Sequence, residues 1–324
     1  MNNLTKERKN NIIGSSQLFL TAVIWGVAFV AQSEGSELLE ANTFNFLRNA
    51  MGVLFLIIVI PILRRKSTGG EARTITAAVK GPDGKTLILG GICCGVMLFG
   101  GMTTQQIGLA YTTVGKAGFI TAMYILLVPV IGLFLGERHG AKLWFGVALA
   151  IVGLYMLCVK ESVVINKGDI LTVCSAIIYS VQILLVDYFS RKVDGVWLSC
   201  LQCTAAAMIS MSCMIAFESP RIENIIAAWM PLLYTGILSS GVAYTMQITG
   251  QSKVKPTIAS LIMSLESVIS AIAGWILLGQ RLSPVEITGC AFIFIAVILA
   301  QLPQRRFESE QEPAAAEYSS DENI

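Results

Sequence analysis

The chain has 324 residues, of which 54% are apolar and only 14% are charged. A soluble domain of this length carries charge on roughly a quarter of its residues, so the composition excludes an ordinary water-soluble protein and indicates a membrane protein. The net charge of +2 gives no reason to expect a nucleic-acid partner, and the lipid bilayer is the partner that the composition implies.

Apolar runs long enough to cross a membrane occur along most of the chain. A bilayer core about 30 Å thick requires about 20 apolar residues in helical form. The predicted spans are residues 12–33, 43–63, 86–110, 117–136, 143–159, 170–186, 195–217, 224–250, 257–279 and 287–302. The sequence therefore predicts an all-α membrane protein with ten transmembrane helices.

Two of these assignments have alternatives. The first run could be a cleaved signal peptide, because Lys6, Arg8 and Lys9 precede it. Its apolar stretch is longer than the usual signal core, which favours a retained helix. The third and fourth runs have no charge between them before Lys116, but together they are too long for one helix. The segment Tyr111-Thr112-Thr113-Val114-Gly115 supplies a turn between them.

Lysine and arginine residues are unevenly divided between the two sides of the predicted membrane. If the N-terminus lies inside, most of the 23 fall on the cytoplasmic side and Arg48 lies within a span. The cytoplasmic residues are Lys6, Arg8, Lys9, Arg64, Arg65, Lys66, Arg73, Lys80, Lys85, Arg138, Lys142, Arg191, Lys192, Lys253, Lys255, Arg305 and Arg306. The outer residues are Lys116, Lys160, Lys167, Arg221 and Arg281. Because positive residues concentrate in cytoplasmic loops, both termini are predicted to be cytoplasmic.

An internal repeat relates the two halves of the chain. Leu135-Gly136-Glu137-Arg138 recurs as Leu278-Gly279-Gln280-Arg281. At the same separation Gly146 corresponds to Gly289 and Ala148 to Ala291, each inside the following apolar run. The separation covers five predicted spans, and an odd number reverses the orientation of the second copy. Inverted repeats of this kind are typical of secondary transporters.

Short segments in a characteristic order add to this pattern. They are Trp25-Gly26 with Phe29, the run from Gly108 to Phe119, Leu135-Gly136-Glu137-Arg138, the run from Gly146 to Ala150, Ser264-Leu265-Glu266, Gly274-Trp275 and Leu278-Gly279. From about Gln17 to Gln301, the chain resembles the EamA-type transporters of the drug/metabolite transporter (DMT) superfamily. Known members mostly export amino acids, nucleosides or other metabolites, or exchange sugar phosphates.

The resemblance implies two inverted five-helix halves. Helices 1, 3, 4, 6, 8 and 9 would surround a central cavity, and helices 5 and 10 would pack outside it. The implied organisation is a cytoplasmic N-terminus at 1–11, a first EamA-like repeat at 12–160, a second at 161–302, and a disordered acidic cytoplasmic tail at 303–324. Ser267 stands where the family usually has proline, which puts a proline-dependent kink in helix 9 in doubt. Gln280 replaces a usual glutamate in an outer turn.

Glu266 is the first candidate functional residue. It lies well inside an otherwise uncharged span, where a charged carboxylate is costly. Its carboxyl group could couple transport to protons or bind a substrate amine. The alternative is a protonated carboxyl that makes a structural hydrogen bond between helices.

Arg48 and several uncharged polar residues are the other candidates. Arg48 could bind an anionic substrate group, but the structural alternative is favoured: a side chain that reaches the outer surface or pairs with nearby Glu34, Glu37 or Glu40. An amide inside a membrane must find a partner or water, either in a cavity or between helices. The cavity candidates, besides Glu266, are Trp25, Gln32, Gln105, Tyr111, Tyr179, Gln182, Tyr244 and Gln247.

No cofactor or metal site is expected. The eight cysteines lie in or beside apolar runs, and the single histidine, His139, lies in a predicted cytoplasmic turn. The sequence contains no P-loop, no HExxH helix and no GxSxG motif.

These features favour a secondary transporter, and most readily an exporter, of a small polar or amino-acid-like metabolite in the cell membrane (inner or plasma). It would work by alternating access, with proton coupling as an option. The alternatives are an intramembrane enzyme and a non-transporting sensor or assembly partner. The sequence does not select a substrate or an oligomeric state.

Overall fold

A computed structural model describes residues 2–68, 75–112, 114–137, 139–158, 166–278 and 283–301. These residues form helices joined by short turns, with no strand among them. The second copy of the repeated motif, at 279–281, and the tail expected at 303–324 lie outside the described residues, as does Arg138 of the first copy.

The first half of the chain forms seven helices, α1 to α7. They are α1 (Asn2–Leu38), α2 (Ala41–Thr68), α3 (Ile75–Lys80), α4 (Gly84–Leu109), α5 (Val114–Thr121), α6 (Tyr124–Phe134) and α7 (Ala141–Cys158). The segment between the second and third predicted spans is partly helical, because α3 lies within it. The fourth predicted span is divided into α5 and α6.

The second half contains α8 to α15 and one π-helix, η1. The elements are α8 (Lys167–Ser190), α9 (Gly195–Phe217), α10 (Ile222–Ala227), α11 (Trp229–Leu233), η1 (Tyr234–Ala243), α12 (Tyr244–Gln251), α13 (Pro256–Met263), α14 (Leu265–Leu278) and α15 (Pro284–Gln301). The π-helix interrupts the eighth predicted span, and the ninth is divided into α13 and α14.

Seven helical stretches of the described chain are long and apolar enough to cross a membrane. They are Arg8–Leu38, Ala41–Pro61, Gly84–Leu109, Val114–Phe134, Lys167–Ser190, Gly195–Phe217 and Pro256–Leu277, and the shorter apolar stretches are Ala141–Met156 and Pro284–Leu299. The fold is thus all-helical with several apolar spans, as a multi-pass membrane protein requires. The count of ten remains a prediction.

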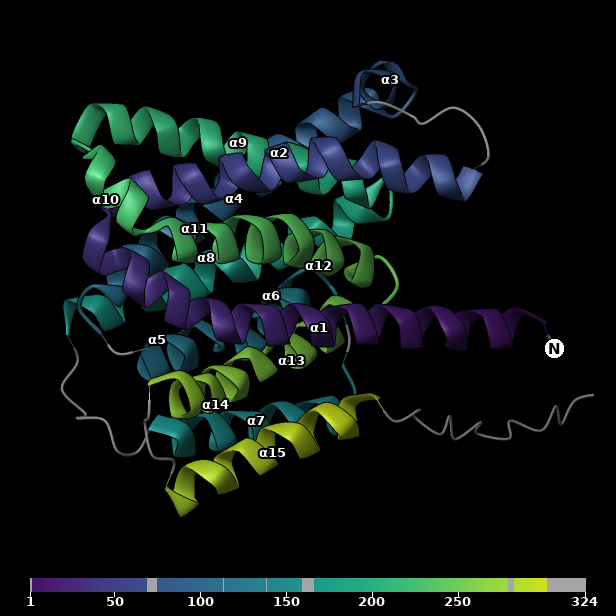
Figure 1. Cartoon of the computed structure of the whole chain (residues 1–324). Coiled ribbons are helices and arrows are strands. Elements are labelled where there is room, and N and C mark those ends of the chain that lie inside the picture. Colours follow the sequence, from purple (N-terminus) through teal and green to yellow (C-terminus); the bar gives the residue numbers. More distant parts are fainter. Residues whose placement is uncertain are drawn as a thin grey trace, which may run out of the picture.

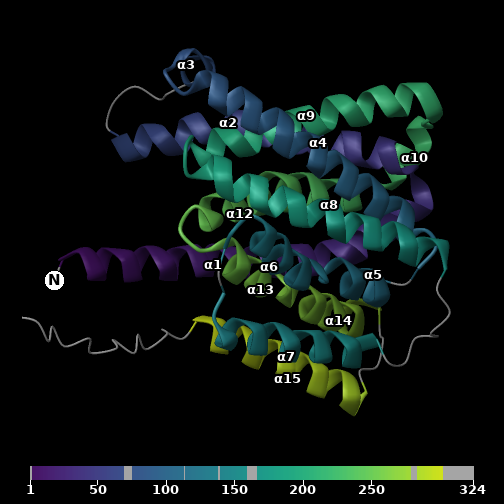
Figure 2. The same cartoon turned by 180° about the vertical axis from the view of Figure 1, so that it is seen from behind.

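The long helices lie side by side in a bundle (Figures 1 and 2). α7 and α15 pack against each other at one edge, and α2 and α9 pack at the opposite edge. α1 runs between these edges and contacts α12, α14 and η1. The first residues of α1 and the end of α15 lie on the same side of the bundle.

Glycines allow close contact between helices. A Cβ atom on Gly26 of α1 would lie 2.5 Å from Cβ of Ile269 on α14. A Cβ atom on Gly95 of α4 would lie 2.5 Å from Cβ of Ala205 on α9. Because dispersion falls off steeply with distance, small residues at such crossings strengthen helix packing where no hydrophobic effect operates.

At the break between α5 and α6, backbone hydrogen bonds join residues three apart instead of four apart. The amide of Met123 donates to the carbonyl of Ile120, and the amide of Ile125 donates to that of Ala122, each three residues back. Pro129 lies inside α6 and cannot donate a backbone hydrogen bond. The helix is therefore interrupted at Ala122 and Met123.

The break between α13 and α14 occurs without a proline. Each of four buried serine hydroxyls donates to a backbone carbonyl three residues earlier, at distances of 2.6 to 2.9 Å. These serines are Ser260, Ser264, Ser267 and Ser270. Serine bonds of this type compete with the backbone ladder and bend helices. The absence of the family's proline at Ser267 therefore does not remove the break in this helix.

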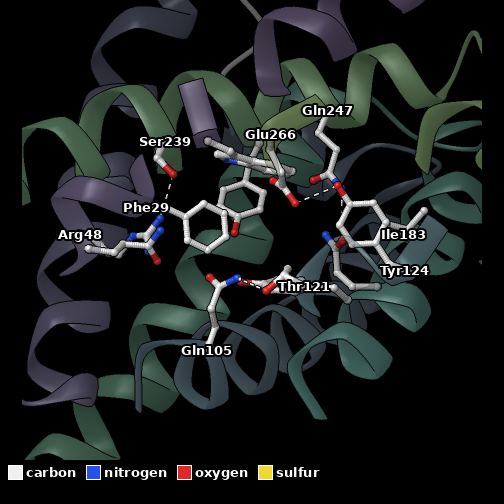
Figure 3. Close-up of a pocket in the computed structure, with 14 residues that line it drawn as sticks. Phe29, Arg48, Gln105, Thr121, Tyr124, Ile183, Ser239, Gln247 and Glu266 are labelled. Carbon is white, nitrogen blue, oxygen red and sulfur yellow. Dashed lines mark hydrogen bonds between the residues drawn. The ribbon is translucent and has the colours of Figure 1, made fainter. Parts of the chain in front are cut away.

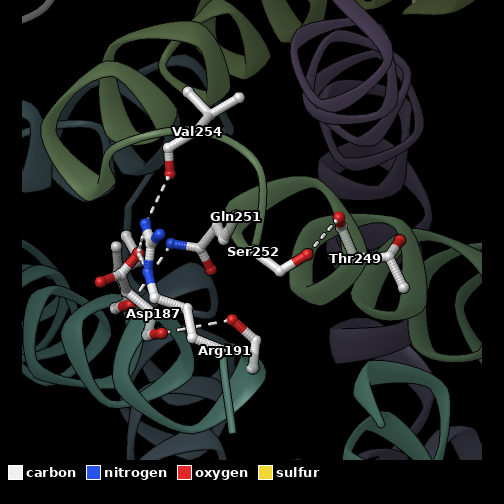
Figure 4. A network of polar contacts seen from close by, with 8 residues as sticks. Asp187, Arg191, Thr249, Gln251, Ser252 and Val254 are labelled. Carbon is white, nitrogen blue, oxygen red and sulfur yellow. Dashed lines mark hydrogen bonds and ion pairs between the residues drawn. The ribbon is translucent and has the colours of Figure 1, made fainter. Parts of the chain in front are cut away.

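A polar network connects the turn before α13 to the end of α8 (Figure 4). Arg191 donates to Asp187 at 2.7 Å and to the backbone carbonyl of Val254 at 3.4 Å. The hydrogen bond that Arg191 donates to Asp187 raises the pKa of Arg191 above its usual value. Gln251 donates to the carbonyl of Ile183 at 3.3 Å. These contacts fix the start of α13 relative to α8.

Candidate functional site

A pocket lies in the middle of the bundle (Figure 3). About 460 Å³ of space not filled by atoms, part of it open to solvent, lies among its lining residues. Its lining residues are Trp25, Phe29, Gln32, Arg48, Gln105, Thr121, Tyr124, Tyr179, Gln182, Ile183, Ser239, Tyr244, Gln247 and Glu266. Both halves of the chain contribute side chains, so the pocket depends on how the halves pack.

The lining residues come from the helices that correspond to predicted spans 1, 3, 4, 6, 8 and 9, together with Arg48 from α2. The breaks in two of these spans lie at the pocket. Thr121 ends α5 and Tyr124 begins α6, while Glu266 is the second residue of α14. The interrupted helices thus present side chains at mid-bundle that a continuous helix would direct differently.

Glu266 is buried, with 3% of its surface exposed. Its Oε1 accepts a hydrogen bond of 2.9 Å from the hydroxyl of Tyr124, which is equally buried. The second oxygen, Oε2, accepts no hydrogen bond from the described residues. A buried carboxyl with one satisfied oxygen retains capacity for a proton or a ligand.

Arg48 is also buried, with 2% of its surface exposed. Its Nη1 donates to Oε1 of Gln32 at 3.0 Å, and its Nη2 donates to Oγ of Ser239 at 2.8 Å. Its Nε lies 3.3 Å from Oγ of Ser240. The sequence predicted that Arg48 reaches the outer surface or pairs with Glu34, Glu37 or Glu40. This prediction is wrong, because the guanidinium points inward and forms no ion pair with any described residue.

Glutamines form a chain along one wall. Nε2 of Gln247 donates to Oε1 of Gln182 at 3.3 Å, and Nε2 of Gln182 donates to Oε1 of Gln202 at the same distance. Oε1 of Gln247 has no hydrogen-bond partner among the described residues. On another wall, Gln105 donates to the hydroxyl of Thr121 at 3.0 Å. These amide groups therefore bond partly to one another, and Oε1 of Gln247 is left without a partner in the wall of the pocket.

Aromatic rings cover the rest of the wall. The rings of Trp25 and Tyr244 lie 4.9 Å apart between centroids and are tilted by 58°. Nε1 of Trp25 has no hydrogen-bond partner among the described residues. Phe29, labelled in Figure 3, is 2% exposed. The pocket therefore joins an aromatic surface to a few polar groups, the combination that small-molecule sites use for affinity and orientation.

All the sequence-predicted candidates except Tyr111 line this pocket. Tyr111 follows the end of α4, is 54% exposed, and lies with its ring 5.2 Å from Nζ of Lys167. The pocket also contains Thr121, Tyr124, Ile183 and Ser239, which the sequence did not single out. Whether any of these residues binds substrate remains a prediction. Among the described residues, no cluster of three or more His, Cys, Asp or Glu side chains is placed to hold a metal ion.

Comparison with known proteins agrees with this architecture. The model of the EamA-like transporter family matches residues 12–159 and 166–302. An uncharacterized transporter of Archaeoglobus fulgidus is 30% identical over 286 residues, which cover 88% of this chain and 84% of that protein. The uncharacterized transporter YoaV of Bacillus subtilis is 20% identical over 283 residues, covering 86% of this chain and 92% of that protein.

A crystal structure shares the fold at 20% sequence identity and a TM-score of 0.72, covering 93% of this chain and 99% of that one. The family and the names of its relatives point to a transporter rather than an enzyme. A multi-pass helical protein with a central polar pocket is the form that such a transporter takes. The chain belongs to the EamA-like transporter family.

Proposed function

We propose that the protein is a secondary transporter of small polar metabolites and that the central pocket is its substrate site. The observation that carries this proposal is the pocket itself. Buried polar side chains from both segments matched by the family model face one central pocket inside an apolar bundle. Burying these groups is costly, and a polar ligand would repay part of that cost by bonding to them.

The proposed membrane topology is ten spans in two inverted halves, with both termini cytoplasmic and the chain in the cell membrane. The domain boundaries are those at 12–160 and 161–302. Two matched segments of the family model support the halves, and interrupted helices in both support their correspondence. The first residues of α1 and the end of α15 lie on one side, as an even number of spans requires. A reporter fused after Gln301 should read as cytoplasmic, and an extracellular reading would overturn this topology.

The proposed mechanism is alternating access. The halves rock about the pocket, and the breaks at α5–α6 and α13–α14 absorb the movement. Interrupted helices near the midplane are a recurring device of such transporters, because they expose backbone and side chains to a central ligand. Glu266 lies at one break and Tyr124 at the other, so movement of either helix changes the surroundings of this carboxyl group.

We further propose that Glu266 couples metabolite export to inward proton movement. Its Oε1 is held by Tyr124 while Oε2 is open to the pocket, so a proton and a substrate group compete for the same carboxyl. Competition for one site is sufficient for exchange of two ligands across a membrane, provided that only the occupied states change conformation.

The experiment that tests this function uses proteoliposomes. Cells with and without the protein are first compared for accumulated and excreted metabolites, and those that differ are loaded into liposomes. An inward proton gradient should accelerate efflux from liposomes holding wild-type protein. Glu266→Gln should remove the effect of the gradient, while Glu223→Gln, an exposed acid on α10, should retain it. Undiminished proton-driven efflux in Glu266→Gln would exclude coupling through this residue, and no efflux by wild-type protein would exclude the transporter itself.

A further inference from the structure

The guanidinium of Arg48 has hydrogen-bonding capacity that the described residues leave unused. A guanidinium carries five N–H groups in a planar fork. Three of them meet the neutral oxygens of Gln32, Ser239 and Ser240. The contacts leave one N–H on each of the two terminal nitrogens, and Arg48 lines the pocket. The pocket thus contains a cationic group with two free donors.

The positive charge of Arg48 also has no negative partner among the described residues. Arginine remains protonated in proteins, so the charge is permanent. Arg48 forms no ion pair within the described chain. Glu34, Glu37 and Glu40, the acids closest in sequence, are exposed at the end of α1 and before α2. Buried charges are normally paired, so a guanidinium left among neutral acceptors indicates an anion supplied from elsewhere.

The local backbone holds the guanidinium toward the pocket. Ser239 and Ser240 are consecutive residues of η1, and both reach the same side chain. A π-helix is wider than an α-helix, and π-helical segments occur frequently at functional sites. On the opposite flank, Gln32 of α1 holds Nη1. Figure 3 shows Arg48 beside Ser239 with its end directed to the space around Phe29.

Two other unpartnered groups face the same space. Nε1 of Trp25 and Oε1 of Gln247 have no hydrogen-bond partner among the described residues. Gln247 is 1% exposed, so water outside the bundle does not satisfy it. An indole N–H complements an anion, and an amide oxygen complements a donor. These unfilled positions indicate a ligand that has both an acceptor and a donor.

We propose that Arg48 binds the carboxylate of the transported substrate, so that the substrates are small metabolites carrying one carboxylate. This inference rests on the proposed transport function and names its substrate class. A carboxylate matches the fork of a guanidinium in two parallel hydrogen bonds. One negative charge balances Arg48, whereas a phosphate dianion would leave an excess negative charge beside the carboxyl of Glu266. The charges of the pocket therefore favour a carboxylate over a phosphate ester.

The test compares matched ligand pairs in which a neutral amide replaces the carboxylate. Purified wild-type protein in detergent is heated with L-leucine or L-leucinamide, L-phenylalanine or L-phenylalaninamide, lactate or lactamide, and nicotinate or nicotinamide. Glycerol 3-phosphate supplies the dianion. Because a ligand that binds the folded state raises the unfolding temperature, at least one carboxylate should raise it while its amide does not. Equal shifts by an acid and its amide, or a shift by the phosphate alone, would overturn the proposal.

Variants of Arg48 test whether this residue binds the carboxylate. For the carboxylate that binds, Arg48→Gln should raise Kd at least tenfold, and Arg48→Lys should raise it less because the charge remains but the fork is lost. Arg221→Gln, a change of the same type at an exposed residue, should leave Kd unaltered. If Arg48→Gln fails to fold, Ser239→Ala should weaken carboxylate binding by loosening Nη2. Unchanged affinity in the folded variants would overturn the assignment.

Transport separates this inference from the function on which it rests. Proteoliposomes with wild-type protein should move the bound carboxylate faster than its amide. Equal transport of both would contradict the role of Arg48 and leave the transporter intact. If no member of the panel is bound or moved and the metabolite comparison also finds no substrate, the proposed function fails and the inference fails with it.

Discussion

The hydroxyl of Tyr124 donates a hydrogen bond of 2.9 Å to Oε1 of Glu266, and each residue stands directly beyond a break in its helix. Tyr124 is the first residue of α6, and Glu266 is the second of α14. One contact at the pocket therefore joins the interrupted helix of the first half to that of the second. A substitution at either residue should therefore affect both breaks.

Replacement of Tyr124 by phenylalanine tests this link. The ring remains while the donor is lost, so Tyr124→Phe should lower the free energy of unfolding by about 1 kcal/mol, a usual value for a single hydrogen bond. It should also alter the pH dependence of transport, because the carboxyl of Glu266 loses its partner. Thermal unfolding in detergent and proteoliposome flux measure the two effects. Tyr188→Phe, at an exposed tyrosine of α8, should change neither.

The serines of α13 and α14 should maintain the break between these two helices. Ser264→Ala with Ser267→Ala removes two hydroxyl bonds to backbone carbonyls, at 2.8 and 2.6 Å. The helix should straighten, because the competing serine bonds are lost and alanine favours helix. Transport should therefore slow. Ser212→Ala, which removes a comparable bond on the exposed face of α9, is the control. Transport at the wild-type rate in the double variant would show that these serines do not control the movement.

Contact between α4 and α9 should tolerate no side chain at Gly95. A methyl group there would lie 2.5 Å from Cβ of Ala205, so Gly95→Ala should destabilise the protein by about 1–3 kcal/mol. Gly100 of the same helix is the matched control, because its added Cβ would lie 3.5 Å from Ile178, an ordinary contact. Unfolding temperatures in one detergent compare the two variants. Equal effects would contradict the close helix contact.

Glu218 provides a cap for α2 from a distant part of the chain. Its two oxygens accept hydrogen bonds from the backbone amides of Asn42 and Thr43 at 2.8 and 2.6 Å, in the first turn of the helix. Glu218→Ala should therefore lower the free energy of unfolding by about 1–2 kcal/mol, as loss of a helix cap does. Glu223→Ala should have little effect, because Glu223 is exposed in the first turn of α10. Matched unfolding curves decide between the cap and a solvated surface acid.

The membrane class and many of the residues that line the pocket could be predicted from the sequence, because both follow from the cost of placing polar groups in a bilayer. An amide or carboxyl in an apolar helix needs a partner, and that requirement identified Gln105, Gln247 and Glu266 without any structure. Tyr111 is the one candidate that does not line this pocket, since it lies beyond the end of α4 and is exposed.

Other features depend on contacts that sequence periodicity does not encode. The direction of Arg48 is set by serines on η1, and a π-helix has no distinctive local pattern. Thr121 and Tyr124 were not singled out in the sequence, because only the break at Ala122 places them at the pocket. The break in the ninth span was uncertain because its cause is a set of serine bonds rather than a proline.

Accessibility of the pocket from each side of the membrane tests the central claim most directly, and it requires no knowledge of the substrate. Gln105→Cys is made in a chain whose eight native cysteines are replaced, and a membrane-impermeant thiol reagent is applied to one side of oriented vesicles at a time. Leu154→Cys, at a buried position of α7, is the control. Alternating access predicts labelling of Gln105→Cys from either side and of Leu154→Cys from neither. Labelling of Gln105→Cys from one side only, or from neither, would contradict the account.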